Sequence, residues 1–140
     1  MPDGLITSIS YISTARSDLA HSDFHNILES ANLRNEELDL TGLLAFNGLN
    51  FMQTLEGSRD NLNSCMRLIE SDKRHDGMVI FSRRETSQRE FPHWRMAGVL
   101  LVSDSREQET TIEQLLSTKW VTPETKQHFE SFKSFGSQAQ

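Results

Sequence analysis

Apolar and polar residues alternate along several short stretches of the chain, a pattern typical of strands with one buried face. The predicted strands are residues 4–13, two runs between residues 40 and 56, residues 76–85, and residues from about 95 to 102. Asn47-Gly48 separates the two middle runs and favours a tight turn, so these runs are predicted to form a hairpin.

Two stretches between these strands instead repeat apolar residues at the spacing of a helix. The first covers about residues 22–34, with Ser22 as the predicted N-cap, and its apolar face consists of Phe24, Ile27, Leu28 and Ala31. The second covers about residues 58–71, begins at Ser58, and turns Leu62, Cys65, Met66 and Ile69 inward.

The resulting order is β-α-β-β-α-β-β, which predicts an α+β fold of the ferredoxin-like type, with two helices crossing an antiparallel sheet. Residues 1–102 are expected to form this domain. Residues 103–140 are expected to be a polar linker, over 103–109, followed by a C-terminal helical extension too short for a second domain.

Within this extension, a short helix is expected around Ile112, Leu115 and Leu116. Val121-Thr122-Pro123 then reads as a staple residue, an N-cap and a first-turn proline. The helix that follows is expected to carry Phe129, Phe132 and Phe135 and to stop near Gly136. Its aromatic residues, with Trp120, are expected either to cover the outer face of the sheet or to join a dimer.

Composition narrows the classes of function. The chain has 140 residues, which suits one domain, and its net charge of −6 without a basic patch argues against nucleic-acid binding. The single cysteine, Cys65, excludes an internal disulfide and fits a reducing cytoplasm. No apolar run approaches the ~18 residues of a membrane span, and the first residues lack the features of a signal peptide.

Gln53 is the polar residue that most needs an explanation. In the stretch FMQTLEG, strand alternation places it on the same face as Phe51 and Leu55, and a buried amide without partners costs a few kcal/mol. Tyr11 and Asn35 also point inward. Each has an ordinary alternative, since a buried Tyr usually bonds the backbone and an Asn after a helix usually caps it, but together the three predict a polar ligand between the helices and the sheet.

The stretch SDKRHDG, residues 71–77, offers a second set of polar groups: Asp72, Lys73, Arg74 and His75. These residues can form a mouth that holds an anion, because Arg presents a planar fork to phosphate while Lys and His add donors. The alternative is a solvated helix C-terminus, where cations interact favourably with the helix dipole.

Other chemistries find little support in the sequence. Among the five histidines only His21 and His25 have helical spacing, and no inward acidic or cysteine partner accompanies them, so no metal site is predicted. The glycines form neither a dinucleotide-binding fingerprint nor a phosphate-binding loop, and no nucleophile motif is present.

Trp94 and Met96, near the start of the last strand, are core residues by default. A regular strand would place them on one face. Pro92 precedes them, however, and favours a bend at Trp94 instead.

The sequence as a whole resembles a BLUF domain, a small blue-light sensor that binds flavin, normally FAD, non-covalently. The resemblance runs from about residue 4 to 102. It is carried by SYIS around Tyr11, LTGLLAFNGLNFMQTLEG over 40–57, DKRH over 72–75 and FPHWRM over 91–96.

This resemblance implies roles for individual residues. Tyr11 corresponds to the photoactive tyrosine and Gln53 to the glutamine between it and the flavin. Asn35 corresponds to the residue that bonds the polar edge of the ring, and Ile27 and Phe51 to apolar ring contacts. The residues expected on the ribityl and phosphate side are Asp72, Lys73, Arg74 and His75.

Trp94 and Met96 correspond to the pair whose placement is linked to signalling. Arg34 departs from the family, in which many members carry Asn or His, but it can still reach the flavin edge. Asp39 also departs from the family and stands where a glycine often precedes the second strand.

The resemblance implies a photoreceptor rather than an enzyme. Light is expected to move an electron and a proton from Tyr11 towards flavin, which rearranges the hydrogen bonds of Gln53. The signal is then expected to pass through the last strand and the C-terminal helices to a downstream protein, with a homo-oligomer as the expected assembly. FMN or riboflavin could replace FAD.

Two other classes of protein remain open from the residues themselves. One is a flavin enzyme, for which no substrate-side acid or base is found. The other is a flavin-free ferredoxin-like protein, either an interaction module or an acylphosphatase-like hydrolase, for which ISTARSD, residues 12–18, is a weak phosphate-loop candidate.

Overall fold

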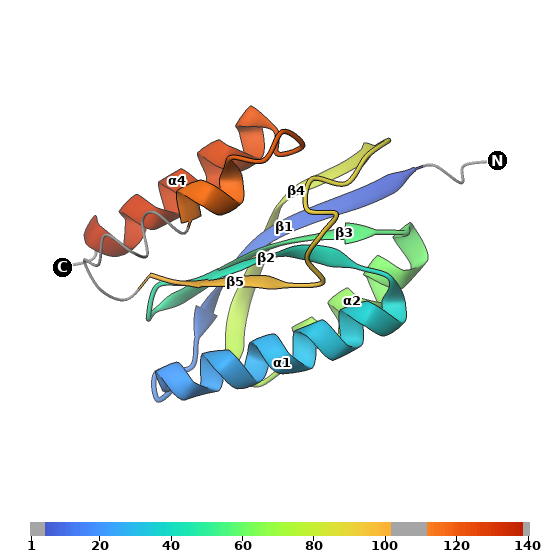
Figure 1. Ribbon diagram of the computed structural model, residues 1–140. Coiled ribbons are helices and arrows are strands. Elements are labelled where there is room, and N and C mark those ends of the chain that lie inside the picture. The colour runs from blue at the N-terminus through green and yellow to red at the C-terminus, as the bar shows by residue number, and fades with distance from the viewer. Residues whose placement is uncertain (1–4, 102–111, 139–140) are drawn as a thin grey trace.

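The computed structural model describes residues 5–101 and 112–138 (Figure 1). The strands are β1 (Ile6–Ala15), β2 (Thr41–Phe46), β3 (Asn50–Gly57), β4 (His75–Thr86) and β5 (Ala97–Leu100). The helices are α1 (His21–Leu38), α2 (Arg59–Glu70) and α4 (Pro123–Gln138), with a short helix over residues 112–116. The predicted order of elements and the α+β class are confirmed.

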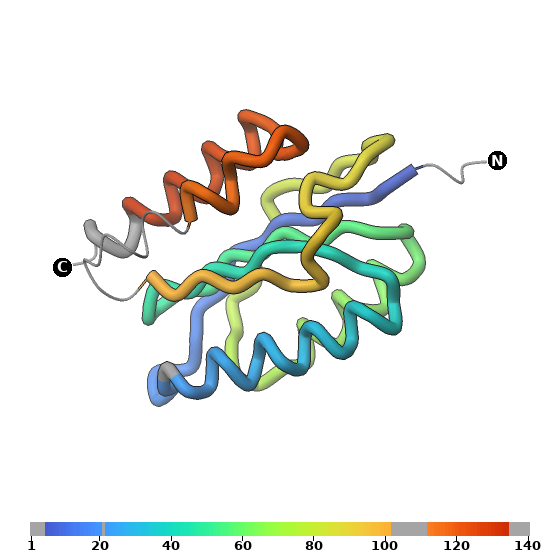
Figure 2. The backbone as a smooth tube through the Cα atoms, viewed as in Figure 1, coloured from blue at the N-terminus to red at the C-terminus, as the bar shows by residue number. Residues whose placement is uncertain are grey.

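The strands form one sheet in the order β4-β1-β3-β2-β5. β1 pairs with β3 and β4, and β2 pairs with β3, all antiparallel. β5 pairs with β2 in parallel, so the expectation of a wholly antiparallel sheet is wrong at this edge. The reason is that the chain crosses the end of the sheet between β4 and β5 and enters the far edge in the direction of β2 (Figure 2).

Each face of the sheet buries its own apolar core. α1 and α2 cover one face, and α4 covers the other (Figure 1). The inner core, under α1 and α2, includes Ile9, Tyr11, Phe51, Leu55 and Met96. The outer core, under the C-terminal helices, includes Leu43, Met52, Phe91, Phe129 and Phe132. The alternation of FMQTLEG is therefore confirmed, because neighbouring residues of β3 enter different cores.

The hairpin between β2 and β3 is also confirmed, with a loop of residues 47–49. Gly48 has a φ of 93°, a conformation that side chains disfavour. The Asn47 Oδ1 atom accepts hydrogen bonds from the backbone N–H groups of Leu49 and Asn50, which closes the turn.

Helix α2 begins as predicted, because Ser58 accepts a hydrogen bond from the Asn61 N–H. The predicted start of α1 at Ser22 is wrong: Ala20 is the N-cap, and its N–H donates to Asp23 Oδ2 at 2.8 Å. α1 also runs past the predicted end, to Leu38, and stops at Asp39, which has a φ of 52°. Asn35 therefore lies inside the last turns of α1 rather than after the helix.

The C-terminal extension packs against its own chain. Thr122 caps α4 as predicted, accepting from the Thr125 N–H, and Pro123 opens the helix. Phe129 and Phe132 are buried in the outer core, which favours covering of the sheet over use in a dimer. The helix ends at Gln138, two residues beyond Gly136, near which the stop was predicted. The side chain of Phe135 and the predicted linker over 103–109 lie outside the described residues.

Truncation of Phe129 should measure how much the outer core contributes to stability. Phe129→Ala removes a fully buried ring, and we expect the free energy of unfolding to fall by about 3–5 kcal/mol in urea titrations. Leu68→Ala is the control, because this side chain of α2 is 56% exposed and lies outside the outer core, and we expect a loss below about 1 kcal/mol. Equal losses for the two variants would contradict the packing of α4 on the sheet.

Candidate functional site

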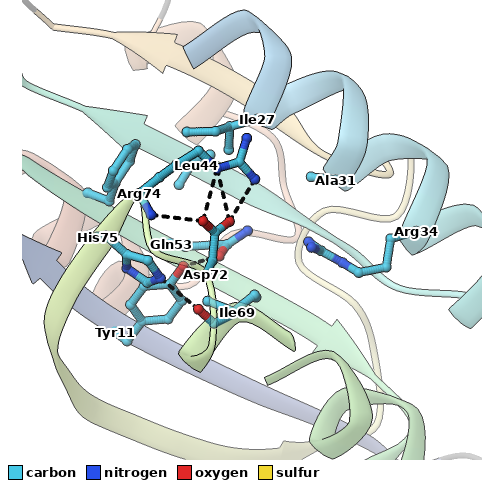
Figure 3. A pocket seen from close by; sticks show the side chains of 11 residues that line it. Tyr11, Ile27, Ala31, Arg34, Leu44, Gln53, Ile69, Asp72, Arg74 and His75 are labelled. Carbon is cyan, nitrogen blue, oxygen red and sulfur yellow. Dashed lines mark hydrogen bonds and ion pairs between the residues drawn. The ribbon is translucent and has the colours of Figure 1, made fainter. Parts of the chain in front are cut away.

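A cavity opens between α1, α2 and the inner face of the sheet (Figure 3). The space between its walls, counted out through the open mouth, is about 430 Å³, of which about 40 Å³ can hold the centre of a water molecule, so the cavity is narrow. Most of the predicted site residues line it: Tyr11, Ile27, Arg34, Phe51, Gln53, Asp72, Arg74 and His75. Ala31, Leu44 and Ile69 complete the lining and were not predicted, because they read as ordinary core residues.

The floor of the cavity is a row of residues across three strands. Tyr11 of β1 and Leu44 of β2 both lie opposite Gln53 of β3 in the strand register. The Tyr11 hydroxyl donates to Gln53 Oε1 at 2.5 Å. This bond turns the other end of the amide away, so that Nε2 donates to the Met96 Sδ at 3.5 Å, a weak acceptor. A Tyr-Gln-Met chain therefore runs from β1 to the segment before β5.

The Tyr11 hydroxyl is held in its protonated form. Burial in the inner core raises the pKa of Tyr11, an effect that the Arg34 cation partly opposes and that Cys65 and Asp72 reinforce. A protonated hydroxyl is what the bond to Gln53 Oε1 requires. Tyr11 can consequently give up a proton only if it loses an electron or gains a better acceptor.

Two buried polar atoms at the α1 side of the site have no protein partner within the described residues. They are Arg34 Nε, whose residue lines the cavity, and Asn35 Oδ1, whose fully buried residue is not part of the lining. The Asn35 Nδ2 is occupied, since it donates to the Arg95 carbonyl at 2.7 Å. An unpaired buried polar group costs about 1–3 kcal/mol, so a ligand with both a donor and an acceptor would fit here. Figure 3 shows Arg34 extending from α1 towards the centre of the cavity.

An ion pair spans the mouth of the cavity. The guanidinium of Arg74 forms a bidentate ion pair with the Asp72 carboxylate, with Nη2 donating to Oδ2 at 2.6 Å and Nε donating to Oδ1 at 3.0 Å (Figure 3). The hydrogen bonds from Arg74 lower the pKa of Asp72. Within the described part of the chain, nothing bonds to Arg74 Nη1, so this nitrogen can still donate to an anion.

His75 has both ring nitrogens engaged. Nε2 lies 2.7 Å from the Ile69 carbonyl and therefore carries a proton, and Nδ1 lies 2.7 Å from Ser13 Oγ. The ring packs between Tyr11 and Phe51, with centroid distances of 6.2 and 6.1 Å. His75 thus forms part of the wall. Lys73, by contrast, is exposed and does not line the cavity.

Trp94 and Met96 lie on different sides of the sheet. Met96 belongs to the inner core beside Gln53, whereas Trp94 packs against the outer core and Phe91. They do not share a face, because residues 87–96 form no strand and β5 begins only at Ala97. The bend expected after Pro92 is confirmed.

Asn32 is a residue that sequence reasoning missed. Its side chain bonds both backbone groups of Met96: Nδ2 donates to the carbonyl at 3.2 Å, and Oδ1 accepts from the N–H at 3.1 Å. The amide therefore replaces a strand partner and holds Met96 against Gln53. The sequence offers one indication of this role: Asn32 is a polar residue that directly follows the buried Ala31 in α1.

The described residues, 5–101 and 112–138, contain neither a metal cluster nor a membrane-spanning helix. No group of three His, Cys, Asp or Glu side chains in these ranges is arranged to hold a metal ion. None of the helices in them combines the length and hydropathy that a bilayer crossing requires.

Residues 6–97 match the family described as sensors of blue light using FAD, the BLUF family. The match covers well over half of the chain. The chain therefore belongs to the BLUF family and is a flavin-binding blue-light sensor.

Curated relatives and solved structures agree. The chain is 35% identical over 98 residues to the beta subunit of a photoactivated adenylate cyclase of Euglena longa, covering 69% of this chain and 11% of that protein. It is 36% identical over 75 residues to the blue light- and temperature-regulated antirepressor BluF of Escherichia coli, covering 54% of this chain and 19% of that protein. The chain thus spans at most about a fifth of either relative.

Among solved structures, the dark state of the BLUF protein BlrB superposes with a TM-score of 0.70 at 28% identity, covering 95% of this chain and 96% of that one. A complex of Klebsiella pneumoniae BlrP1 with calcium and cyclic diGMP gives a TM-score of 0.80 at 28% identity, covering 94% of this chain and 34% of that one. Both matches include most of the C-terminal extension.

The chemistry of the cavity lining suits a flavin. An isoalloxazine ring is a flat aromatic system with carbonyl acceptors and one N–H donor on its polar edge. Arg34 Nε lines the cavity and lacks an acceptor, which a ring carbonyl can supply, whereas Asn35 Oδ1 lacks a donor but lies behind the lining. Ile27 and Phe51 supply apolar walls for the ring.

Alkaline titration should test the environment of Tyr11, which is the only tyrosine of the chain. Because burial raises its pKa, the folded protein keeps the proton at a pH where the unfolded chain loses it, so stability should fall as the pH rises above about 10. We expect tyrosinate absorption to appear only with unfolding, measured as a difference spectrum against Tyr11→Phe. A titration midpoint near 10 in the folded protein would contradict this.

Proposed function

We propose that Tyr11 and Gln53 form the photochemical switch of this sensor. The observation that supports the proposal is the buried chain from the Tyr11 hydroxyl through the Gln53 amide to the Met96 sulfur. In this arrangement one amide joins the electron donor to the segment that leads into β5. The switch and the start of an output path thus share a single side chain.

A bound flavin supplies blue-light absorption and a strongly oxidising excited state. With flavin bound, Tyr11 would supply the electron that the excited ring takes up, and its bond to Gln53 Oε1 would give the hydroxyl proton an immediate acceptor. Gln53 has one accepting and one donating end of similar shape, so rotation or tautomerisation changes what it offers to the ring and to Met96. Once Tyr11 regained the electron and a proton, the altered hydrogen bonds of Gln53 would persist and constitute the signal.

The same proposal assigns the other cavity residues. Asn35 and Arg34 hold the polar edge of the ring, and Ile27 and Phe51 contact its faces. Asp72 and Arg74 hold the ribityl and phosphate side, with His75 as a wall. Lys73 can join them only if its exposed side chain folds back over the mouth.

We propose FAD as the natural cofactor, in agreement with the description of the family. FMN is named with one neighbour, Klebsiella pneumoniae BlrP1, so the shorter flavins remain candidates for this chain as well. The free donor of Arg74 at the mouth supports a cofactor that carries phosphate.

Output is proposed to pass through residues 87–101 to the C-terminal extension and on to a separate protein in the cytoplasm, with the sensor as a homo-oligomer. On this view residues 1–102 bind flavin and residues 103–140 transmit the signal. A catalytic role for this chain as a flavin enzyme or an acylphosphatase-like hydrolase is disfavoured, because the family is one of sensors.

Two substitutions test the switch. Tyr11→Phe and Gln53→Leu each remove one end of the hydrogen bond and preserve most of the packing. We expect both variants to retain flavin but to lose the reversible red shift of the flavin band under blue light, recorded by absorption spectroscopy.

Thr54→Val is the matched control for these variants. Thr54 is adjacent to Gln53 and buried, but it faces away from the cavity and bonds Ser10. It should photocycle as the unmodified chain does. A normal red shift in Tyr11→Phe or Gln53→Leu would show that the proposed switch is wrong.

The role of Arg74 can be tested by exchanging the flavin. Arg74→Leu removes a charged donor, so affinity for FAD and FMN should fall about 10–100-fold while affinity for riboflavin stays nearly constant. Fluorescence titrations of the apoprotein with each flavin give the dissociation constants. Lys73→Leu is the control and should change none of them; an equal loss for all three flavins in Arg74→Leu would contradict a phosphate contact.

A further inference from the structure

Two glutamates outside the cavity are almost completely buried. Glu56 ends β3 with 1% of its surface exposed, and Glu90 lies in the segment between β4 and β5 with 3% exposed. A buried carboxylate is costly unless it is well supplied with donors, so each should hold specific groups. Neither lines the cavity, and the switch proposed above uses neither.

Glu56 holds the backbone of the segment that leads to Trp94 and Met96. Its Oε1 accepts from the Glu90 N–H at 2.8 Å, and its Oε2 accepts from the Phe91 N–H at 2.7 Å. Oε2 also accepts from the Thr41 hydroxyl at 2.8 Å. β3, the strand that carries Gln53, is therefore bonded to the backbone of residues 90–91 through the side chain of Glu56.

Glu90 in turn holds the start of α4. Its Oε1 accepts from the Thr122 N–H at 2.7 Å, and its Oε2 accepts from the Thr125 hydroxyl at 2.8 Å. Arg84 of β4 donates to the same Oε2 at 2.9 Å. A carboxylate at a helix N-terminus is favourable because it meets the positive end of the helix dipole. Glu90 thus caps α4 from a different part of the chain.

We propose that Glu56 and Glu90 form a clamp that couples the Trp94–Met96 segment to α4. The backbone N–H of Glu90 donates to Glu56, and the side chain of Glu90 accepts from Thr122 and Thr125 at the start of α4. A shift of residues 90–96 therefore has to move or release the first turn of α4. This inference rests on the proposed function, which supplies the movement at Met96.

The segment is suited to carry such a movement. Residues 87–96 belong to no strand, and the Gly42 N–H of β2 donates a single backbone bond to the Trp94 carbonyl at 3.1 Å. β5 after them is only 4 residues long, so a shift of this segment breaks no long ladder. Figure 2 shows this segment crossing the end of the sheet where β1 begins and β3 ends. Within the C-terminal extension, the carboxylate of Glu90 accepts hydrogen bonds from the first turn of α4.

Glu90→Gln tests the clamp in the full flavin-loaded chain. The substitution keeps the size of the side chain but directs an amide N–H₂ at Arg84 or at the helix start. Hydrogen exchange of a peptide covering residues 120–128 is measured in darkness and under blue light. In the unmodified chain we expect light to accelerate this exchange; in Glu90→Gln we expect dark exchange about tenfold faster and little further effect of light.

The control is Glu124→Gln, which changes an exposed carboxylate on the same helix turn, 3.6 Å from the same Arg84. It should leave dark exchange and the response to light as they are. Both variants should keep the red shift of the flavin band, because neither residue lines the cavity. If Glu90→Gln does not fold, Thr125→Val removes one donor to Glu90 without changing shape and should give a smaller effect of the same sign.

The outcomes separate this inference from the proposed function. A normal red shift with exchange near α4 that does not respond to light overturns the clamp and leaves the switch intact. Equal effects of Glu90→Gln and Glu124→Gln also overturn it. Absence of any red shift in the unmodified chain overturns the proposed function, and the coupling falls with it.

Discussion

The hydrogen bond between Tyr11 and Gln53 is the contact on which the rest of the site depends. It joins two neighbouring strands in the interior of the sheet, β1 and β3, on the inner face, where Tyr11 and Gln53 are each only 3% exposed. A phenol and an amide are tolerated there because each satisfies the other. The bond also decides the direction of the amide, so that Nε2 faces the sulfur of Met96.

The surrounding structure keeps this bond in a fixed geometry. β1 and β3 pair along most of their length, so neither backbone can slide relative to the other. Asn32 holds the backbone of Met96 from α1, and His75 closes the other side of Tyr11. The proposed switch is thus a small rearrangement inside a rigid frame. Because the frame does not absorb the displacement, a change of one amide can alter the position of residues farther along the chain.

The two faces of the sheet have different roles. The inner face builds the cavity, and the outer face docks the C-terminal extension. Glu56 and Gln53 lie on the same strand but face opposite sides, so one strand contacts both the cavity and the segment that holds α4. Trp94 and Met96 also lie on opposite faces, Trp94 at the outer core and Met96 in the inner core, because the chain bends between them.

The local pattern was enough to predict most elements and much of the cavity lining. The alternation in β3 places Gln53 inward, and the caps Ser58 and Thr122 follow from side-chain chemistry within a few residues. Assignment of flavin and light came from resemblance to a family, since a row of polar groups specifies only a polar ligand.

Long-range contacts decided the remainder. The parallel pairing of β5, the role of Asn32 and the burial of Glu56 and Glu90 each depend on residues at least 15 positions apart in the chain. Local periodicity carries no information about such partners, because it reports only which face a residue occupies. The sequence by itself determined which side chains turn inward; the tertiary structure decided which of them meet, because only the packed sheet brings their donors and acceptors within bonding distance.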